Sequence, residues 1–403
     1  MKIAIKIIIS SIKDGTFFDK VFNRLYLKYL FIARKILEPK IKIKNNKILF
    51  LTFQGNYNCN PKAIADEIIK RGLDYELVWA CRKENFNELE QYPKELKLIN
   101  RRSLEFYKEA ASCKFIIDNA NNFEYLKLNK KEGQILLQPW HGSMGFKRIE
   151  TNKNANWMKK AAYLDEITDY CIVNSTFEID VFKNTFWKST PMLKYGHPRN
   201  DILFNKNNEY EIYTKKVKEM YGIDKDTKIL LYAPTFRDDS SFESYGLDYN
   251  RLYKALSKKF GGKWIILVRF HFKLKNAKVD KKYLDKVINA TNYPDMQELM
   301  CACDIGVTDY SSWMCDYVLT RRPGFLFATD LDNYNNERGF YYPLDSTPFK
   351  LAFNNDDMIN NILNYDDREY QKEVDKFLKD RGCFEKGNAS FKTVNKIIEL
   401  TNK

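Results

Sequence analysis

The sequence predicts an α/β protein of two domains, each a parallel β-sheet of the Rossmann type covered by helices on both faces. Short apolar runs typical of buried strands alternate with helical patterns along most of the chain. A polar stretch at 205–210 interrupts this alternation once, so we expect a first domain at 47–205 and a second at 206–403. With 403 residues, the chain is long enough for two hydrophobic cores. A leader of different composition, residues 1–46, precedes them.

Ten short apolar runs are expected to form the strands. They lie at 47–53, 75–79, 114–118, 135–138, 170–173 and 192–195 in the first domain, and at 229–233, 264–269, 305–308 and 324–328 in the second. Helix signals lie between them. Asn60-Pro61-Lys62 places a proline in a first helical turn, and Asp295 is an N-cap with Glu298 three residues later. The tail from residue 356 has a helical pattern with two glycine interruptions.

The leader carries much of the positive charge. Residues 1–50 hold twelve Lys or Arg against three Asp or Glu, which is +9 of the chain's net +14. Aromatic and basic residues are interleaved at 17–37, a pattern that favours a helix on an anionic membrane surface. The alternative is a helix packed on its own domain with a solvated basic face. No apolar run reaches the roughly 18 residues of a membrane span, and we expect no signal peptide.

Two function classes are disfavoured by composition. A nucleic-acid partner is not expected, because the excess charge is concentrated in one segment instead of being spread over the chain. Eight cysteines without a Cys-x-x-Cys pair, and only three histidines, argue against a zinc site or a disulfide framework. A reducing cytoplasm is therefore the expected compartment.

Polar clusters follow four of the predicted strands. In open α/β sheets ligands bind beyond the carboxyl ends of the strands, so these clusters are expected to face one site. They are Gln138–Ser143, Ala233–Asp239, Arg269–His271 and Thr308–Ser312. Two of the three histidines, His141 and His271, lie in them, which favours a functional role.

The stretch from Asp304 to Asp316 reads as a strand that turns directly into a helix. Free amides at the start of such a helix, with the positive end of its dipole, form an anion site. Ser311 and Ser312 would add hydroxyl donors there. The alternative is that a serine merely caps the helix while Asp316 faces solvent.

The chemistry that these clusters favour is phosphoryl transfer. Arg237, Arg269 and Arg338 could neutralise phosphate oxygens. A histidine is suited to take a proton from an attacking hydroxyl near neutral pH. The sequence contains neither a Gly-x-x-x-x-Gly-Lys-Ser/Thr loop nor a Gly-x-Gly-x-x-Gly motif, so an ATPase or a dinucleotide enzyme is not supported.

Several motifs, taken in order, resemble the CDP-glycerol glycerophosphotransferase family, which builds teichoic acids and related glycerol-phosphate capsule polymers. The matching segments are Trp140–Ser143, Gly196 with Pro198–Asp201, Tyr232–Arg237, Arg269-x-His271, Thr308–Ser312 with Asp316, and Arg338–Tyr341, with looser matches at Asn60–Lys62 and Gly387–Ser390. The resemblance runs from about residue 50 to residue 390. Phe272 departs from it, where the family usually has proline. His197 stands where an aromatic is common, so we assign it a structural role.

The resemblance implies a GT-B-like fold, in which two Rossmann-like domains face a cleft. It implies a peripheral enzyme on the cytoplasmic face of the cell membrane. Such an enzyme moves a polyol phosphate, most plausibly glycerol phosphate, from a CDP-activated donor to a hydroxyl of a lipid-linked or polymer acceptor and releases CMP.

The resemblance also implies residue roles. His141 would be the base, with Trp140, Gly142 and Ser143 beside it on the acceptor side. His271 would act with the donor phosphates. The remaining donor-binding residues would be Arg237, Arg269, Thr308, Asp309, Tyr310, Ser311, Ser312, Asp316 and Arg338. No metal is required by any carboxylate cluster, although Asp309 and Asp316 could assist one.

Two other functions stay open from the sequence. A GT-B glycosyltransferase that uses a nucleotide sugar would share the fold but perform C–O chemistry. A non-catalytic binder of polyanions or membranes would spread its basic residues over one face, unlike this chain. The sequence leaves open which polyol is transferred and whether one unit or many are added.

Overall fold

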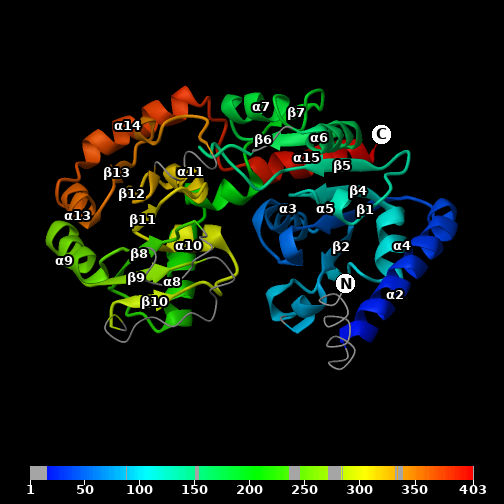
Figure 1. Ribbon diagram of the computed structural model, residues 1–403, viewed down its shortest axis with the longest axis horizontal. Coiled ribbons are helices and arrows are strands. Elements are labelled where there is room, and N and C mark those ends of the chain that lie inside the picture. Colours follow the sequence, from blue (N-terminus) through cyan, green and yellow to red (C-terminus); the bar gives the residue numbers. More distant parts are fainter. Residues whose placement is uncertain are drawn as a thin grey trace, which may run out of the picture.

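The computed structural model describes residues 16–402 apart from 88, 150–153, 236–245, 271–282, 284, 332–333 and 335–338 (Figure 1). Two α/β domains lie side by side, each centred on a parallel sheet. The expected GT-B-like class is confirmed. All eight cysteines are free.

The first domain contains a seven-stranded sheet in the order β3-β2-β1-β4-β5-β6-β7. Its strands are β1 (Lys44–Leu51), β2 (Glu76–Cys81), β3 (Leu96–Asn100), β4 (Cys113–Asp118), β5 (Ile135–Gln138), β6 (Tyr170–Val173) and β7 (Met192–Lys194). All neighbouring pairs are parallel, and Leu49 of β1 lies between Val78 of β2 and Ile116 of β4. Helices cover both faces, so the central strands are apolar on both sides.

The second domain contains a six-stranded parallel sheet in the order β10-β9-β8-β11-β12-β13. Its strands are β8 (Lys228–Tyr232), β9 (Trp264–Val268), β10 (Val287–Asn289), β11 (Ile305–Thr308), β12 (Gly324–Phe327) and β13 (Lys350–Ala352). The chain order reverses between β8 and β11, whose carboxyl ends lead into the segments 233–235 and 309–312. Such a switch point is where an open α/β sheet binds its ligand.

The described helices surround these sheets. They are α2 (Thr16–Leu37), α3 (Cys59–Lys70), α4 (Leu104–Ser112), α5 (Asn122–Tyr125), α6 (Ala155–Ile167), α7 (Thr176–Lys183), α8 (Glu209–Tyr221), α9 (Tyr249–Phe260), α10 (Met296–Ala302), α11 (Trp313–Tyr317), α13 (Asn355–Leu363), α14 (Asp367–Asp380) and α15 (Ala389–Thr401). The predicted starts of α3 and α10 are confirmed. Asp295 caps α10 by accepting a hydrogen bond of 2.9 Å from the amide of Gln297.

The chain crosses between the domains twice. It passes from the first to the second through the 3-10 segment Pro198–Phe204. Near its end it returns, because Val394, Ile397 and Leu400 of α15 lie in the core of the first domain against α3 (Figure 1). We had expected 206–403 to stay in the second domain. Helix α15 departs from that expectation because its apolar face is buried by the first sheet.

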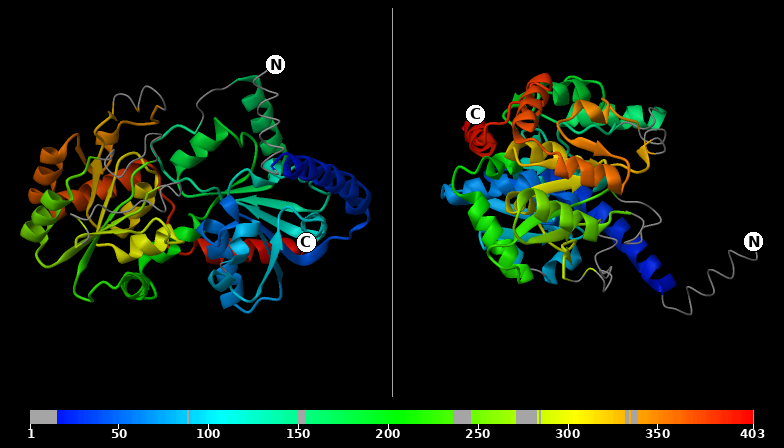
Figure 2. Two further views of the ribbon diagram at one scale, coloured as in Figure 1. Left: turned by 60° about the horizontal axis from the view of Figure 1, so that its bottom comes forward. Right: turned by 90° about the vertical axis from the view of Figure 1, so that its left-hand side faces the viewer.

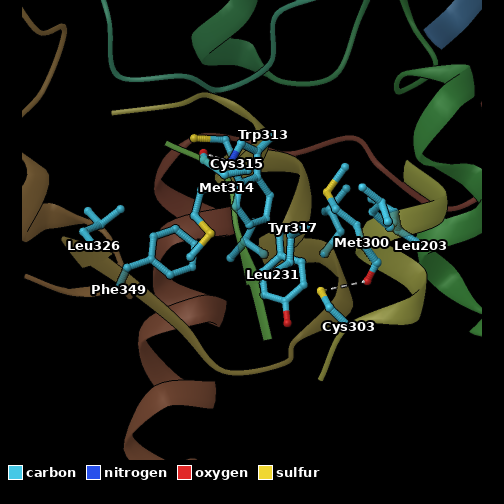
Figure 3. Packing of buried hydrophobic residues seen from close by; sticks show 14 of the residues in the cluster. Leu203, Leu231, Met300, Cys303, Trp313, Met314, Cys315, Tyr317, Leu326 and Phe349 are labelled. Carbon is cyan, nitrogen blue, oxygen red and sulfur yellow. Dashed lines mark hydrogen bonds between the residues drawn. The ribbon is translucent and has the colours of Figure 1, made fainter. Parts of the chain in front are cut away.

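A dense core fixes the turn between β11 and α11 (Figure 3). A side chain at Gly306 of β11 would place its Cβ 2.8 Å from the Tyr317 ring, and one at Gly324 of β12 would lie 2.7 Å from Met314. These two glycines therefore let the short helix α11 pack directly on the sheet. Met144 and Phe146 of the first domain are also buried in this core, so the two domains share it.

Helix α2 lies at the periphery of the first domain (Figure 2). Leu30 is buried, Arg34 lies over the Tyr107 ring of α4 at 5.1 Å, and the Tyr26 hydroxyl donates to the carbonyl of Arg102 at 3.0 Å. The other faces of the helix expose several large apolar side chains. Among the described residues, no helix combines the length and the apolar character that crossing a bilayer requires.

Candidate active site

The two domains bring the segment Trp140–Ser143 and Ser312, the last residue of the Thr308–Ser312 cluster, to one pocket. This pocket has a volume of about 440 Å³, and His141 and Ser143 of the first domain and Ser312 and Tyr341 of the second are among its lining residues. Gly145 permits the close approach, since a Cβ added there would lie 2.9 Å from the Cβ of Ser312. Two of the four strand-end clusters therefore contribute lining residues to this pocket, and that all four face one site stays a prediction.

His141 follows the end of β5 and has a defined tautomer. Its Nδ1 lies 2.6 Å from the backbone carbonyl oxygen of Asn119. A carbonyl can only accept, so Nδ1 carries the proton and Nε2 keeps a lone pair. Within the described part of the chain, no group hydrogen-bonds to Nε2. A neutral imidazole held in this way can take a proton from a hydroxyl.

The surroundings keep the imidazole neutral. Solvent reaches the ring at the pocket, but the protein packed around it desolvates the cationic form and lowers the pKa of His141 to about 4. The positive charge of Arg199 acts in the same direction. At neutral pH the ring is therefore a free base.

A buried network sets the backbone beside His141. Trp140 has a φ of +48°, a left-handed conformation that is unusual for a bulky residue. The side-chain amide of Asn60, fully buried, donates to the carbonyls of Pro139 at 2.7 Å and Trp140 at 2.9 Å. Its oxygen accepts from the amide of Arg199 at 3.0 Å, and the Arg199 guanidinium donates to the carbonyl of Gly142. In the sequence, Asn60 and Arg199 appear only within motif matches, and no local pattern indicates that they hold the backbone beside His141.

Asp316 joins the domains instead of facing the pocket. It is 2% exposed; one carboxylate oxygen pairs with the Arg199 guanidinium at 2.9 Å and the other accepts from Asn200 Nδ2 at 2.9 Å. We expected it among the donor-binding residues or on the solvent side. The structure contradicts the solvent-side alternative, because Asp316 is buried and both of its oxygens have buried partners, and a donor-binding role stays a prediction.

Thr308, Asp309 and Tyr310 are buried next to the two serines that follow them and make hydrogen bonds inside the second domain. The Thr308 hydroxyl donates to the carbonyl of Ala233 at 2.7 Å. Asp309 is buried and accepts from the amide of Thr235 at 2.7 Å, which fixes the turn after β8. The buried Tyr310 donates to Asp330 at 2.8 Å. These side chains support the strand ends, and a role in direct donor contact stays a prediction.

Ser311 and Ser312 differ from their neighbours. Both are only partly buried. Ser312 precedes α11 but its side chain makes no capping hydrogen bond, so the capping alternative is not what the structure has. Neither hydroxyl has a hydrogen-bond partner among the described residues. Both are therefore available to a ligand.

Arg269 follows β9, and its amide donates to the carbonyl of Tyr232 at 2.8 Å. Burial lowers the pKa of its guanidinium, whereas the nearby Asp295 carboxylate favours the charged form. Arg237, His271 and Arg338 lie outside the described residues. Among the residues that the structure does describe, no group of three or more His, Cys, Asp or Glu side chains could hold a metal ion.

His197 is completely buried, and its Nε2 lies 3.0 Å from the carboxylate of Glu178. Burial by itself lowers the pKa of this ring, but the Glu178 carboxylate outweighs it and raises the pKa above its ordinary value. The structural role expected for His197 agrees with this placement.

Comparison with known proteins matches residues 31–399 to the family described as CDP-glycerol:poly(glycerophosphate) glycerophosphotransferase. The chain belongs to this family. It is similar to the teichoic acid poly(glycerol phosphate) polymerase of Staphylococcus epidermidis, with 31% identity over 88% of this chain and 51% of that protein. It is also similar to the enzyme of the same name from Bacillus spizizenii, with 28% identity over 93% of this chain and 99% of that protein. The chain thus spans about half the length of one relative and nearly all of the other.

A solved structure of a variant of the wall teichoic acid polymerase TagF, soaked with CDPG, has the same fold. The TM-score is 0.81 at 28% identity, over 95% of this chain and 98% of that one. The family resemblance expected from the motifs is therefore confirmed. As a member of the glycerophosphotransferase family, the chain presents its motifs from both domains at the pocket described above.

Proposed function

We propose that this protein transfers glycerol phosphate from CDP-glycerol to a hydroxyl of an anionic polymer acceptor and releases CMP, as a step in teichoic-acid-like or capsule polymer synthesis. Membership of the family supports this, as do the names of the relatives. The observation that carries the proposal is His141, with a proton-free Nε2, in a pocket completed by Ser312 of the other domain.

The proposed reaction is a displacement at phosphorus. The acceptor hydroxyl oxygen attacks the phosphorus that bears glycerol, the bond from that phosphorus to the oxygen bridging to CMP breaks, and CMP leaves. Nε2 of His141 takes the hydroxyl proton. Ser311, Ser312 and Arg269 would hold the pyrophosphate, and Arg237, His271 and Arg338 stay predicted donor contacts. Preorganised donors of this kind stabilise charge on the leaving group.

Donor profiling separates this function from a nucleotide-sugar transferase. Purified protein would be incubated with CDP-glycerol, CDP-ribitol, UDP-glucose or GDP-mannose and a glycerol-phosphate acceptor. We expect CMP release from CDP-glycerol and a product heavier by one glycerol phosphate in mass spectra. UDP or GDP release with glycosylated product would replace our proposal, and preference for CDP-ribitol would change the polyol.

We further propose that α2 docks the protein on the cytoplasmic face of an anionic membrane, near a lipid-linked acceptor. Phe22, Leu25, Tyr29, Ile32 and Ile36 recur every three or four residues, and each is more than half exposed. They form one apolar stripe, while Leu30 and Arg34 on another face are buried against the domain. Basic residues beside this stripe, within the +9 of residues 1–50, suit anionic lipid.

Vesicle sedimentation tests the docking. Replacing Phe22, Leu25 and Ile32 by serine should abolish binding to vesicles rich in phosphatidylglycerol and leave the melting temperature unchanged, because these side chains are exposed. Wild-type protein should bind neutral phosphatidylcholine vesicles weakly. Equal binding by the triple variant and the wild type at low salt would rule out this role for α2.

A further inference from the structure

Two buried polar residues, Asn174 and Ser175, directly follow β6 at the edge of the first sheet where His141 follows β5. Ser175 caps α7, because its hydroxyl oxygen accepts a hydrogen bond of 3.0 Å from the amide of Glu178. The backbone amide of Asn174 donates to the Glu178 carboxylate at 2.8 Å. Its backbone carbonyl accepts from the amide of Phe384 at 2.6 Å. The position of Asn174 is therefore set by contacts with two other segments of the chain.

The side-chain hydrogen bonds of this pair have one consistent direction. The Glu178 amide can only donate to Ser175, so the hydroxyl hydrogen of Ser175 is used elsewhere, and it bonds to Oδ1 of Asn174 at 3.0 Å. Nδ2 of Asn174 donates to the hydroxyl oxygen of Ser143 at 2.9 Å. The reverse orientation of the Asn174 amide would leave the buried hydroxyl hydrogen of Ser175 without an acceptor among the described residues. Ser143 is therefore the acceptor in its hydrogen bond with Asn174.

The hydroxyl hydrogen of Ser143 consequently points away from Asn174. Ser143 is partly buried and lines the pocket that also contains His141 and Ser312. Within the part of the chain that the structure describes, no group accepts a hydrogen bond from this hydroxyl. Ser143 thus presents one hydrogen-bond donor to an oxygen atom of a ligand in the pocket.

The backbone on either side of Ser143 is also held in place. The carbonyl of Gly142 accepts from the Arg199 guanidinium. The carbonyl of Met144, a fully buried residue, accepts from the hydroxyl of Tyr342 in the second domain. The Ser143 hydroxyl therefore needs little reorganisation to donate, and preorganised donors of this kind stabilise charge that develops during a reaction.

We propose that the Ser143 hydroxyl donates a hydrogen bond to a nonbridging oxygen of the phosphorus that is transferred, with Asn174 as its positioning residue. This inference rests on the proposed function and deepens it. The oxygen that gives its proton to Nε2 of His141 bonds to this phosphorus, so the phosphorus lies near the base, and Ser143 is two residues further along the same pocket lining. A phosphoryl oxygen carries negative charge and is a stronger acceptor than a polyol hydroxyl. Ser143 keeps its own proton throughout the transfer.

Phosphorothioate donors test the contact. Sulfur replaces one nonbridging oxygen of the phosphorus bearing glycerol in each of two CDP-glycerol diastereomers, and sulfur accepts hydrogen bonds weakly. We expect S143A to lower kcat/KM about 10–100-fold with CDP-glycerol and with one diastereomer, the effect of one hydrogen bond to a charged group. With the diastereomer whose sulfur replaces the contacted oxygen, S143A should lower kcat/KM by less than about 3-fold, because that hydrogen bond is already lost.

The variant N174D tests the positioning role. A carboxylate can only accept, so Ser143 would donate to Asn174→Asp and no longer offer its hydrogen to the pocket. N174D should match S143A in kcat/KM and in its response to sulfur, and S143A/N174D should be no slower than either single variant. S189A is the control, because Ser189 is exposed on the same domain, lies outside the pocket lining and donates to Asp165 at 2.8 Å. It should keep the wild-type rates with all three donors.

The outcomes separate the contact from a structural role. Equal losses in S143A with all three donors, or no loss with any of them, would overturn the proposed contact. A raised KM for the acceptor alone would assign Ser143 to acceptor recognition instead. The donor comparison uses S143A only, so it decides the proposal even where N174D does not fold. If wild-type protein released no CMP from CDP-glycerol, the proposed function itself would fail.

Discussion

The two sides of the pocket differ in how far their polar groups are hydrogen-bonded within the protein. On the first-domain side, Nδ1 of His141 is held by the carbonyl of Asn119, and Asn60 and Arg199 fix the neighbouring backbone through buried hydrogen bonds. On the second-domain side, Ser311 and Ser312 follow the buried Thr308 and Asp309, yet their hydroxyls have no partners among the described residues. On the first side the backbone and one nitrogen of the base are fixed and Nε2 of the base is left open, whereas on the second side both hydroxyls are open to a ligand.

We infer from this difference that the first-domain side provides the base and the second-domain side binds the donor. A base is most effective when its tautomer and direction are set before the substrate arrives, and the buried network provides that. Groups that bind a charged donor exchange their hydrogen bonds to water for hydrogen bonds to phosphate. Their hydroxyls must therefore be accessible and held in position by the residues beneath them. Substitutions on the first side should therefore affect turnover, and substitutions on the second side should affect donor affinity.

His141→Ala should have the largest effect on activity. A positioned base typically contributes about 10²–10⁴-fold, so turnover should fall by that order. Affinity for CDP-glycerol should stay nearly unchanged, because the proposed donor groups Ser311, Ser312 and Arg269 belong to the second domain and the ring belongs to the first. Turnover, donor affinity by calorimetry and melting temperature would be measured together. A folded variant with normal turnover would remove the general-base role.

The pH profile sharpens this test. With the pKa of His141 at about 4, the base is unprotonated over the whole neutral range, and kcat/KM should decline only as pH falls toward 4. An acid limb near pH 6.5 that belonged to His141 would contradict the lowered pKa.

Arg199→Ala should produce the largest loss of stability. Removing one partner of a buried ion pair costs about 3–5 kcal/mol, and here it also leaves the carbonyl of Gly142 without its donor. Urea unfolding would measure the loss. The double variant R199M/D316L, which removes both charges, should be less destabilised than the sum of the single variants. Simple additivity of the two would mean that the pair does not couple the domains.

Replacing Ser311 and Ser312 together by alanine should weaken CDP-glycerol binding by about 1–3 kcal/mol. The melting temperature should change little, because neither hydroxyl has a partner in the described structure and Ser312 does not cap α11. Calorimetry with the donor measures the affinity directly. Unchanged affinity in a folded double variant would show that the serines do not contact phosphate.

Glu385→Gln should have the smallest effect, on the pH dependence of stability. Burial raises the pKa of Glu385 to about 7, while its unfolded value is near 4.5. The folded state therefore binds more protons between these values, and stability should fall as pH rises through that window. The variant should remove this fall, a difference of about 1–3 kcal/mol at pH 8. The exposed Glu373→Gln is the control, and an equal pH response in the Glu385 variant and the wild type would contradict the raised pKa.

Much of the fold followed from the sequence because central strands are apolar on both faces. All ten predicted strands are present, and β5, β6 and β11 have the predicted bounds. The three strands that the sequence did not predict, β3, β10 and β13, are all at sheet edges. These three edge strands are partly solvated, as in the pattern of buried and exposed residues along Leu96–Asn100, so their apolar signal is weak.

The family, the α/β class and the clusters from which the pocket is built could be predicted from the sequence, because they depend on local periodicity and on short motifs. The roles of residues within these clusters depend on how the chain folds. Folding pairs Asp316 with Arg199, engages Thr308 and Asp309 inside the second domain, and returns α15 to the first. Each of these depends on contacts between residues more than 70 positions apart, and such contacts leave no pattern in the local sequence.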